Sequence, residues 1–137
     1  MKQEKSCGAV IFRGDEDASR RFYLILKSIQ GHTTLCKGHV ERDETERETA
    51  VREIREETGL TVDFLDGFRQ VIAYSPKPGH WKEVVFFLAR SRGGRITCQP
   101  EEVADARFLP FDAAMERLTH PSDRDVLAAA DAFLNGR

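Results

Sequence analysis

Short runs of β-branched and aromatic residues alternate with polar stretches over the first forty or so positions. Ser6–Arg13 (SCGAVIFR) and Phe22–Lys27 (FYLILK) are apolar runs of the length and composition typical of strands. The residues between them, Gly14–Arg20 (GDEDASR), predict a polar turn. The following stretch, Ile29–Glu41 (IQGHTTLCKGHVE), has no periodicity and is predicted to be a loop.

A helix is predicted from Thr45 to Thr58, because this segment contains no Gly or Pro and is dominated by Glu and Arg. Two capping boxes are compatible with its start: Asp43 with Glu46, or Thr45 with Glu48. Gly59 is placed to end the helix in a left-handed conformation that other residues resist.

The second half of the chain predicts more strands and then helices. Extended segments are expected within Val62–Tyr74 around Gly67, at Glu83–Arg90 and near Ala106–Leu109, with a loop at Ser75–His80. Gly93 and Gly94 predict a hairpin turn into a strand at Arg95–Cys98. One or two helices are expected between Asp112 and Leu134. This order predicts an α/β fold, a mixed sheet with helices on its faces, and no linker or repeat divides residues 1–137 into more than one domain.

Composition and charge narrow the class of protein. The 137 residues are 40% hydrophobic and 32% charged, which excludes collagen-like, low-complexity and membrane-spanning chains. A net charge of −2 gives no bulk attraction to nucleic acid, so neither a nucleic-acid partner nor a membrane is expected. Cys7, Cys36 and Cys98 form no CxxC pair, which favours a reducing compartment, and we expect the cytoplasm.

The most informative segment is the acidic stretch from Glu41 to Glu57. It holds eight acidic residues and four arginines, a local charge of −4, so the rest of the chain is +2. Most such charge runs are simply solvated helix faces. Here, at about 100° per residue, three glutamates fall on one helix face: Glu53, Glu56 and Glu57. A separate stripe is expected to pack on the sheet: Ala50, Val51, Ile54 and Thr58.

Three carboxylates on one face repel one another by a few tenths of a kcal/mol per pair, even when the helix is exposed. Arg52 can reach Glu56 at i+4 and offsets part of this repulsion. A divalent cation would offset the rest, and oxygen-only ligands favour Mg2+ or Mn2+, which also bind substrate phosphates. The segment therefore predicts a metal site for phosphate chemistry.

The same segment resembles a known family motif. Gly38, five residues, Glu44, seven residues and then Arg52–Leu60 (REIREETGL) is similar to the Nudix box at every fixed position. The resemblance implies an α/β/α sandwich and a hydrolase of nucleoside diphosphates linked to another moiety. It implies that Arg52 orients the glutamates. It also implies a set of metal ligands or water activators: the Gly38 carbonyl, Glu53, Glu56 and Glu57.

Flanking residues resemble the asymmetric diadenosine tetraphosphate hydrolase branch of this family. The similar segments are KGHVE (37–41), CGAVIFR (7–13), KEVVFFLA (82–89) and EVADARFL (102–109). By this resemblance, Tyr74 and Phe133 would sandwich an adenine, although each is also compatible with an ordinary core aromatic. The polyphosphate would meet three basic residues: Lys37, His39 and Lys82. Glu102 would complete the metal cluster or act as base, with Glu101 beside it as a second candidate.

The chain differs from this branch just before the box. Thr33, Leu35 and Cys36 stand where the branch has an aromatic residue and prolines, and the only tryptophan is Trp81. Without proline, the backbone φ angle in this segment is not fixed. Cys36 is compatible with a reactive thiol or with inert packing.

The sequence therefore predicts metal-dependent attack of water on a phosphorus of a dinucleoside polyphosphate, giving ATP and AMP from diadenosine tetraphosphate. Other substrates stay open: another nucleoside polyphosphate, an RNA 5′ end or a diphosphoinositol polyphosphate. The last would demand a denser basic surface than Lys37, Lys77 and Lys82 provide. A non-catalytic nucleotide-sensing module is the alternative from a different class, and the sequence predicts no oligomeric state.

Overall fold

The two strands that contain the apolar runs AVIF and VVFFLA form the middle of a sheet. In the computed structural model, which describes residues 2–14 and 20–137, β1 (Lys2–Arg13) pairs in parallel with β7 (His80–Ser91). Ser6 lies opposite Val84, and the register continues to Phe12 opposite Arg90. The predicted polar turn after β1 falls largely on residues 15–19, which lie outside the described residues.

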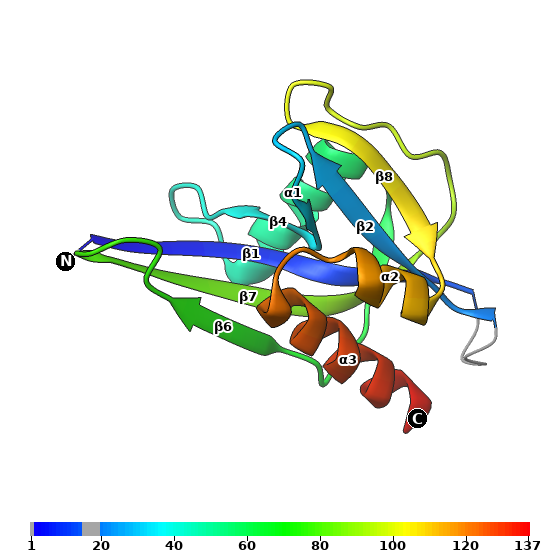
Figure 1. Ribbon diagram of the computed structural model, residues 1–137. Helices are drawn as coiled ribbons and strands as arrows, with labels where there is room; N and C mark the ends of the chain where they lie inside the picture. Colours follow the sequence, from blue (N-terminus) through cyan, green and yellow to red (C-terminus); the bar gives the residue numbers. More distant parts are fainter. Residues whose placement is uncertain (1, 15–19) are drawn as a thin grey trace.

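The remaining strands extend this pair on both sides. They are β2 (Phe22–Ser28), β3 (Thr33–Thr34), β4 (Cys36–His39), β5 (Val62–Phe64), β6 (Gln70–Tyr74) and β8 (Val103–Leu109). Across the two described ranges, one eight-stranded mixed sheet has the order β3-β2-β1-β7-β5, with β4 on β1, β6 on β7 and β8 on β2. The central β1–β7 pair therefore has neighbours along both of its edges (Figure 1).

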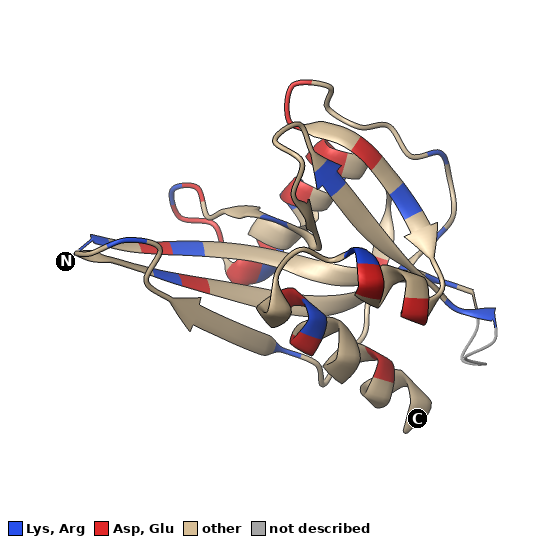
Figure 2. Cartoon of the chain, viewed as in Figure 1, with Lys and Arg blue, Asp and Glu red and all other residues tan. Residues whose placement is uncertain are grey.

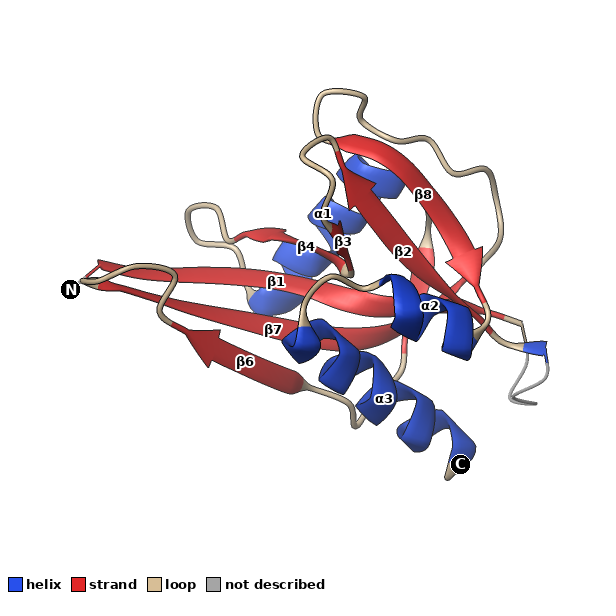
Figure 3. Cartoon of the chain, viewed as in Figure 1, coloured by secondary structure: helices blue, strands red, loops and turns tan. Residues whose placement is uncertain are grey.

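Helices cover both faces of the sheet. Their bounds are α1 (Glu46–Thr58), α2 (Phe111–Arg117) and α3 (Pro121–Asn135). Helix α1 lies on one face, while α2 and α3 lie on the other (Figure 3). The predicted α/β fold with a mixed sheet and helices on both faces is confirmed. None of the helices described here combines the length and apolar character that crossing a bilayer requires.

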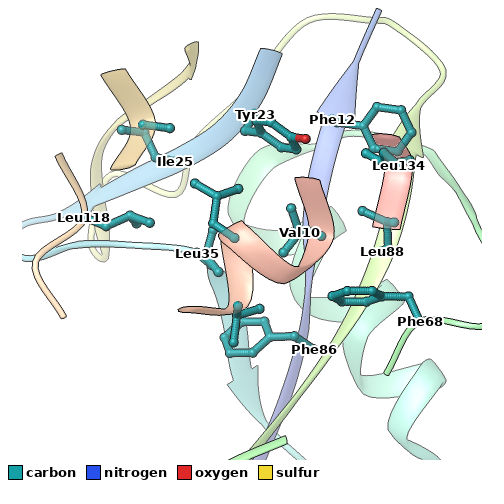
Figure 4. Close-up of a cluster of buried hydrophobic side chains, with 14 of the residues drawn as sticks. Val10, Phe12, Tyr23, Ile25, Leu35, Phe68, Phe86, Leu88, Leu118 and Leu134 are labelled. Atoms are coloured by element: carbon teal, nitrogen blue, oxygen red, sulfur yellow. The ribbon is translucent and has the colours of Figure 1, made fainter. Parts of the chain in front are cut away.

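Side chains of the central strands alternate between two hydrophobic clusters. On β1, Val10 and Phe12 join the cluster under α2 and α3, which Figure 4 shows in close-up. Ala9 and Ile11 join the cluster under α1. Because both faces are covered, the strand appears in the sequence as a continuous apolar run rather than an alternating one.

Two predictions about strands are wrong. The segment predicted as a loop, 29–41, contains β3 and β4, and β4 pairs with β1 in antiparallel register, Cys7 opposite Gly38. The segment predicted as a strand after Gly94, residues 95–98, is irregular. It has no edge to join, because β1 occupies one side of β7, and β5 and β6 occupy the other.

Helix α1 begins and ends as the sequence predicts. The Thr45 side chain accepts a hydrogen bond from the Glu48 amide, and the Glu48 side chain accepts one from the Thr45 amide, so the second of the two capping boxes is present. Gly59 ends the helix at φ 72°, in the left-handed region. One residue of the predicted apolar stripe, Val51, is 36% exposed, because it lies about 100° around the helix from the buried Ala50.

Candidate active site

Strand β4 crosses directly over the acidic face of α1, and a glycine permits this close approach. A Cβ atom built on Gly38 would overlap the Glu53 carboxylate. Glu53 is only 9% exposed, so its carboxylate lies packed beneath the strand. Any larger residue at position 38 would push the Glu53 carboxylate out of its place, so the position of this carboxylate depends on glycine here.

Arg52 holds several acidic groups together. Its Nε and Nη2 donate to the two carboxylate oxygens of Glu44 at 2.7 and 3.0 Å. Its Nη1 donates to Glu53 at 2.8 Å and to Glu56 at 3.1 Å. Nη2 also donates to the His39 carbonyl at 2.8 Å, which ties α1 to the end of β4. Hydrogen bonds from Arg52 and from the Glu41 amide lower the pKa of Glu44 to about 2.

The carboxyl groups of Glu53 and Glu57 lie close together and interact. Burial raises the pKa of both carboxyl groups, and each stands within hydrogen-bonding reach of the other. The Cys36 thiol donates to Glu57 Oε1 at 3.2 Å and opposes the rise at Glu57. The charge of Glu102 adds to it. The repulsion between two such carboxylates disfavours the state in which both are ionised, and a nearby positive charge favours it.

Basic side chains approach the acidic helix from the sheet. Burial and the neighbouring Lys37 lower the pKa of Lys82, so the two ammonium groups repel each other. Lys82 lies opposite Tyr74 in the β6–β7 register. An anionic ligand between the two lysines would remove this repulsion, which makes them suitable for binding a polyphosphate.

One cavity of about 380 Å³ brings these groups together. Predicted residues line it from four parts of the fold: Lys37, Gly38 and His39 on β4, Lys82 on β7, Arg52, Glu53, Glu56 and Glu57 on α1, and Glu102 in the loop before β8. Acidic residues along α1 and the loop preceding it are visible in Figure 2. Glu101 does not line this cavity, so the geometry favours Glu102 of the two neighbours.

The donor set of the cavity fits a hard divalent ion, because it consists of carboxylate and carbonyl oxygens. In residues 2–14 and 20–137, no three His, Cys, Asp or Glu side chains stand grouped as ligands. The hydrogen bonds give the reason: the carboxylates of Glu53 and Glu56 accept from Arg52, and that of Glu57 accepts from the Cys36 thiol. Side-chain rotation would turn these oxygens to a cation, and a cation would also relieve the repulsion between Glu53 and Glu57.

The predicted aromatic pair is not brought together. Tyr74 is 41% exposed and lines a second cavity of about 240 Å³ next to the first turn of α3. Phe133 lies in the last turn of that helix and packs edge-on against Phe68, with ring centroids 5.6 Å apart. The rise of an α-helix places Phe133 about 15 Å along the axis from Asp123, which lines the Tyr74 cavity.

Several residues of the site have roles that sequence reasoning did not assign. Glu44 anchors Arg52, and its fixed place in the motif was the available signal. The contact of Cys36 with Glu57 has no local signal, since the two lie on different elements. His120 and Asp123 line the Tyr74 cavity, and only the packing of α3 on the sheet brings them there.

Comparison with known proteins identifies this arrangement. Residues 2–130 match the family described as NUDIX domain. The chain belongs to the Nudix hydrolase family. This Nudix chain is 38% identical to the mouse bis(5'-nucleosyl)-tetraphosphatase [asymmetrical] over 142 residues, covering 95% of each chain. The predicted resemblance to the Nudix family and to this branch is confirmed.

A solved structure and a bacterial relative extend the comparison. The structure of a C. elegans Ap4A hydrolase binary complex matches with a TM-score of 0.87 and 25% identity, covering 98% of the Nudix chain and 99% of that chain. The 8-oxo-(d)GTP phosphatase of Mycolicibacterium smegmatis is 42% identical over 94 residues, which cover 69% of the Nudix chain. The Nudix chain spans only 28% of the length of that relative.

Proposed function

We propose that this Nudix hydrolase cleaves dinucleoside polyphosphates, such as diadenosine tetraphosphate, into ATP and AMP. The observation that carries the proposal is the cavity in which acidic residues of α1 face Lys37 and Lys82. Such a cavity accommodates a polyphosphate between cations and the lysines. The similarity over nearly the full length of the mouse asymmetrical tetraphosphatase supports this choice of substrate class.

The proposed reaction is attack of water on one phosphorus of the bridge. The water oxygen forms the new P–O bond, the bond from that phosphorus to the leaving phosphate oxygen breaks, and the water proton passes to a carboxylate. Glu102 or one of the three glutamates Glu53, Glu56 and Glu57 accepts this proton, since these four line the cavity. Lys37, His39 and Lys82 bind the phosphates and orient the scissile bond.

We propose Mg2+ or Mn2+ as the cofactor. The Gly38 carbonyl, Glu53, Glu56 and Glu57 would hold it, and when bound it would neutralise phosphate charge and lower the pKa of water. Arg52 keeps these glutamates on one side of the cavity through its hydrogen bonds to Glu53 and Glu56. A bound cation would offset the repulsion between these crowded carboxylates.

The nucleoside is proposed to lie in the cavity beside Tyr74, whose ring is exposed and available for stacking. Stacking of a base on an aromatic ring contributes about 1–3 kcal/mol. Lys37 lines both this cavity and the acidic one. The two cavities are therefore adjacent at Lys37, and one substrate can extend from one into the other. Of the two predicted aromatic residues, Phe133 supports the fold here rather than the base, because its ring packs on Phe68.

Product analysis tests the proposal. Dinucleoside polyphosphates, nucleoside triphosphates including 8-oxo-dGTP, and 5′-triphosphorylated RNA are incubated with the chain and Mg2+, in oxygen-18 water. The proposal expects ATP and AMP from diadenosine tetraphosphate, with label in one of them, and no turnover in EDTA. Faster turnover of 8-oxo-dGTP or RNA ends would replace the substrate assignment. Tight binding without any turnover would favour the nucleotide-sensing alternative.

Variants of the glutamates complete the test. Glu53→Gln and Glu57→Gln are expected to lose most activity, and Glu102→Gln to lose part or most of it. Glu101→Gln is the matched control, because Glu101 is exposed and does not line the cavity. Near-normal turnover in both helix variants at saturating Mg2+ would exclude the proposed metal site.

The wider setting is also part of the proposal. We propose that residues 1–137 act as one domain on a small-molecule substrate, without a membrane or a stable nucleic-acid partner. A cytoplasmic location fits the three cysteines, which the structure leaves as free thiols.

A further inference from the structure

The chain leading into β4 is joined to the start of α3 by hydrogen bonds between residues far apart in the sequence. The Thr33 amide donates to Thr119 Oγ1 at 2.8 Å, and the Thr119 amide donates to the Thr33 carbonyl at 2.9 Å. The Leu35 amide donates to the carboxylate of Asp123, in the first turn of α3. Together these hydrogen bonds form the β3–α3 clamp.

The segment held by the clamp has few constraints of its own. Strand β3 contains only two residues, which pair with β2. Leu35 follows it outside any strand and is 1% exposed, and the Asp123 carboxylate provides the partner that a buried amide requires. No proline fixes φ in residues 33–35. The backbone at these positions therefore depends on the clamp.

Lys37 lies just beyond the clamp and lines both the acidic cavity and the Tyr74 cavity. In β4 its backbone is paired with β1, where Gly8 lies opposite Lys37. The chain at Lys37 is thus fixed by the clamp before it and by β1 beside it. Only Cys36 separates Lys37 from residues 33–35, so a shift of those residues would move the ammonium group relative to the acidic residues of α1.

Thr119 can act on this site only through the clamp. Its side chain is exposed, and it lines neither of the two cavities, so it does not contact a ligand that fills them. Because it is exposed, a substitution there leaves no void in the core. Asp123, in contrast, is buried and charged, so its replacement would change stability and electrostatics together.

We propose that Thr119 is a positioning residue for Lys37. Through the β3–α3 clamp it holds the lysine ammonium group at the junction of the two cavities, where the nucleoside and the polyphosphate of the substrate meet. The assignment rests on the proposed function for the phosphates that Lys37 binds. It adds that a residue outside both cavities controls part of the affinity for the polyphosphate.

Calorimetry on the full chain with Mg2+ tests the assignment, with methylenediphosphonate as the probe because water does not cleave its P–C–P bridge. Thr119→Val removes the acceptor for the Thr33 amide and keeps the shape of the side chain. We expect it to bind the probe about 2- to 10-fold more weakly, as for the loss of one hydrogen bond. Thr119→Ser keeps the acceptor and should bind as wild type. Thr61→Val, at an exposed threonine outside the clamp, is the matched control.

A double-mutant cycle with Lys37→Met shows whether the effect passes through the lysine. Mg2+ and Lys82 remain in this variant, so we expect weaker but measurable binding. Adding Thr119→Val to Lys37→Met should then cause no further loss, because the positioned group is gone. An equal loss in both backgrounds, or wild-type affinity in Thr119→Val, overturns the assignment. The expected cycle without hydrolysis of diadenosine tetraphosphate would overturn the proposed function and leave the role of Thr119 standing.

Discussion

Arg52 shows how one side chain organises the site at the scale of single residues. Its guanidinium donates to Glu44 with two nitrogens and to Glu53 and Glu56 with a third. The planar, five-donor geometry of arginine makes this arrangement feasible, and lysine cannot reproduce it. Positioning of the glutamates therefore depends on the shape of Arg52 as well as its charge.

Arg52→Lys is expected to lower kcat about 10- to 100-fold, the range measured when partners of metal ligands are removed. Apparent metal affinity should fall with it, because Glu53 and Glu56 lose their common donor. Steady-state kinetics at several Mg2+ concentrations measure both. Arg55→Lys, exposed on the same helix, is the control and should behave as wild type. An unchanged kcat in Arg52→Lys would mean that charge alone suffices.

Cys36 lowers the pKa of Glu57 through the hydrogen bond from its thiol. Cys36→Ala removes this donor and should raise the pKa of Glu57 further above its ordinary value. The acid limb of the pH–rate profile is then expected to move to higher pH, measured as kcat/KM against pH. Cys36→Ser restores a donor and should move the limb back. A profile that is the same in both variants would separate Cys36 from the chemistry.

Gly38→Ala tests the close approach of β4 to α1. The added methyl group would overlap the Glu53 carboxylate, so we expect soluble, folded protein with most activity lost. Circular dichroism checks the fold, and turnover of diadenosine tetraphosphate checks the activity. Gly136→Ala is the matched control, because Gly136 has an ordinary φ of −86° and no close neighbour.

At the scale of elements, α1 depends on its N-terminal cap. Thr45→Ala removes the side-chain acceptor for the Glu48 amide, and caps of this kind contribute about 0.5–2 kcal/mol. We expect the free energy of unfolding in urea to fall by about 1 kcal/mol. Thr61→Ala, exposed beyond the helix, serves as the comparison and should change little. Equal effects of the two substitutions would contradict the role of the cap.

Elements with a strong local signal were predicted well. The capping residue Thr45, the left-handed Gly59 and the unbroken helix between them follow from local chemistry that needs no tertiary context. Strand β4 was missed, because pairing with the distant β1 makes it a strand. The strand expected at 95–98 failed for the opposite reason, since the edges of β7 were already filled.

The same distinction holds for the site. The carboxylates of α1 belong to one continuous motif, and the structure has Glu53, Glu56 and Glu57 lining one cavity with Lys37 and Lys82. The sequence left Phe133 open between a base-stacking and a core role, because a helical aromatic reveals its face only when the helix has docked; here its ring packs on Phe68. Asp123 was not singled out, because its burial is created entirely by the packing of α3.

At the scale of the whole molecule, stability and cation binding are linked through Glu53 and Glu57. Their pKa values are raised in the folded chain, so the folded state holds protons more tightly than the unfolded state. Their contribution to stability is therefore present at low pH and is lost as pH rises through the raised pKa values. A cation bound by the ionised carboxylates would offset their repulsion and should reverse this loss.

We therefore expect Mg2+ to raise Tm by a larger increment at about pH 8 than at about pH 5. Thermal unfolding with Mg2+ or EDTA across this range measures the increment. In Glu57→Gln the dependence of the increment on pH should largely disappear, because one of the two competing carboxylates is gone. An increment that is constant with pH in wild type would show that the cation does not replace a proton.

The parallel pairing of β1 with β7 also determines when the protein can fold during its synthesis. Ser6 leaves the ribosome long before Val84, its partner in the sheet. Until then, the apolar β1 segment of the nascent chain has no parallel neighbour, and apolar strands that stay unpaired during folding are prone to aggregate. Slow translation between these two strands would prolong that exposure, so this fold favours rapid elongation or a chaperone that shields the emerging N-terminal strand.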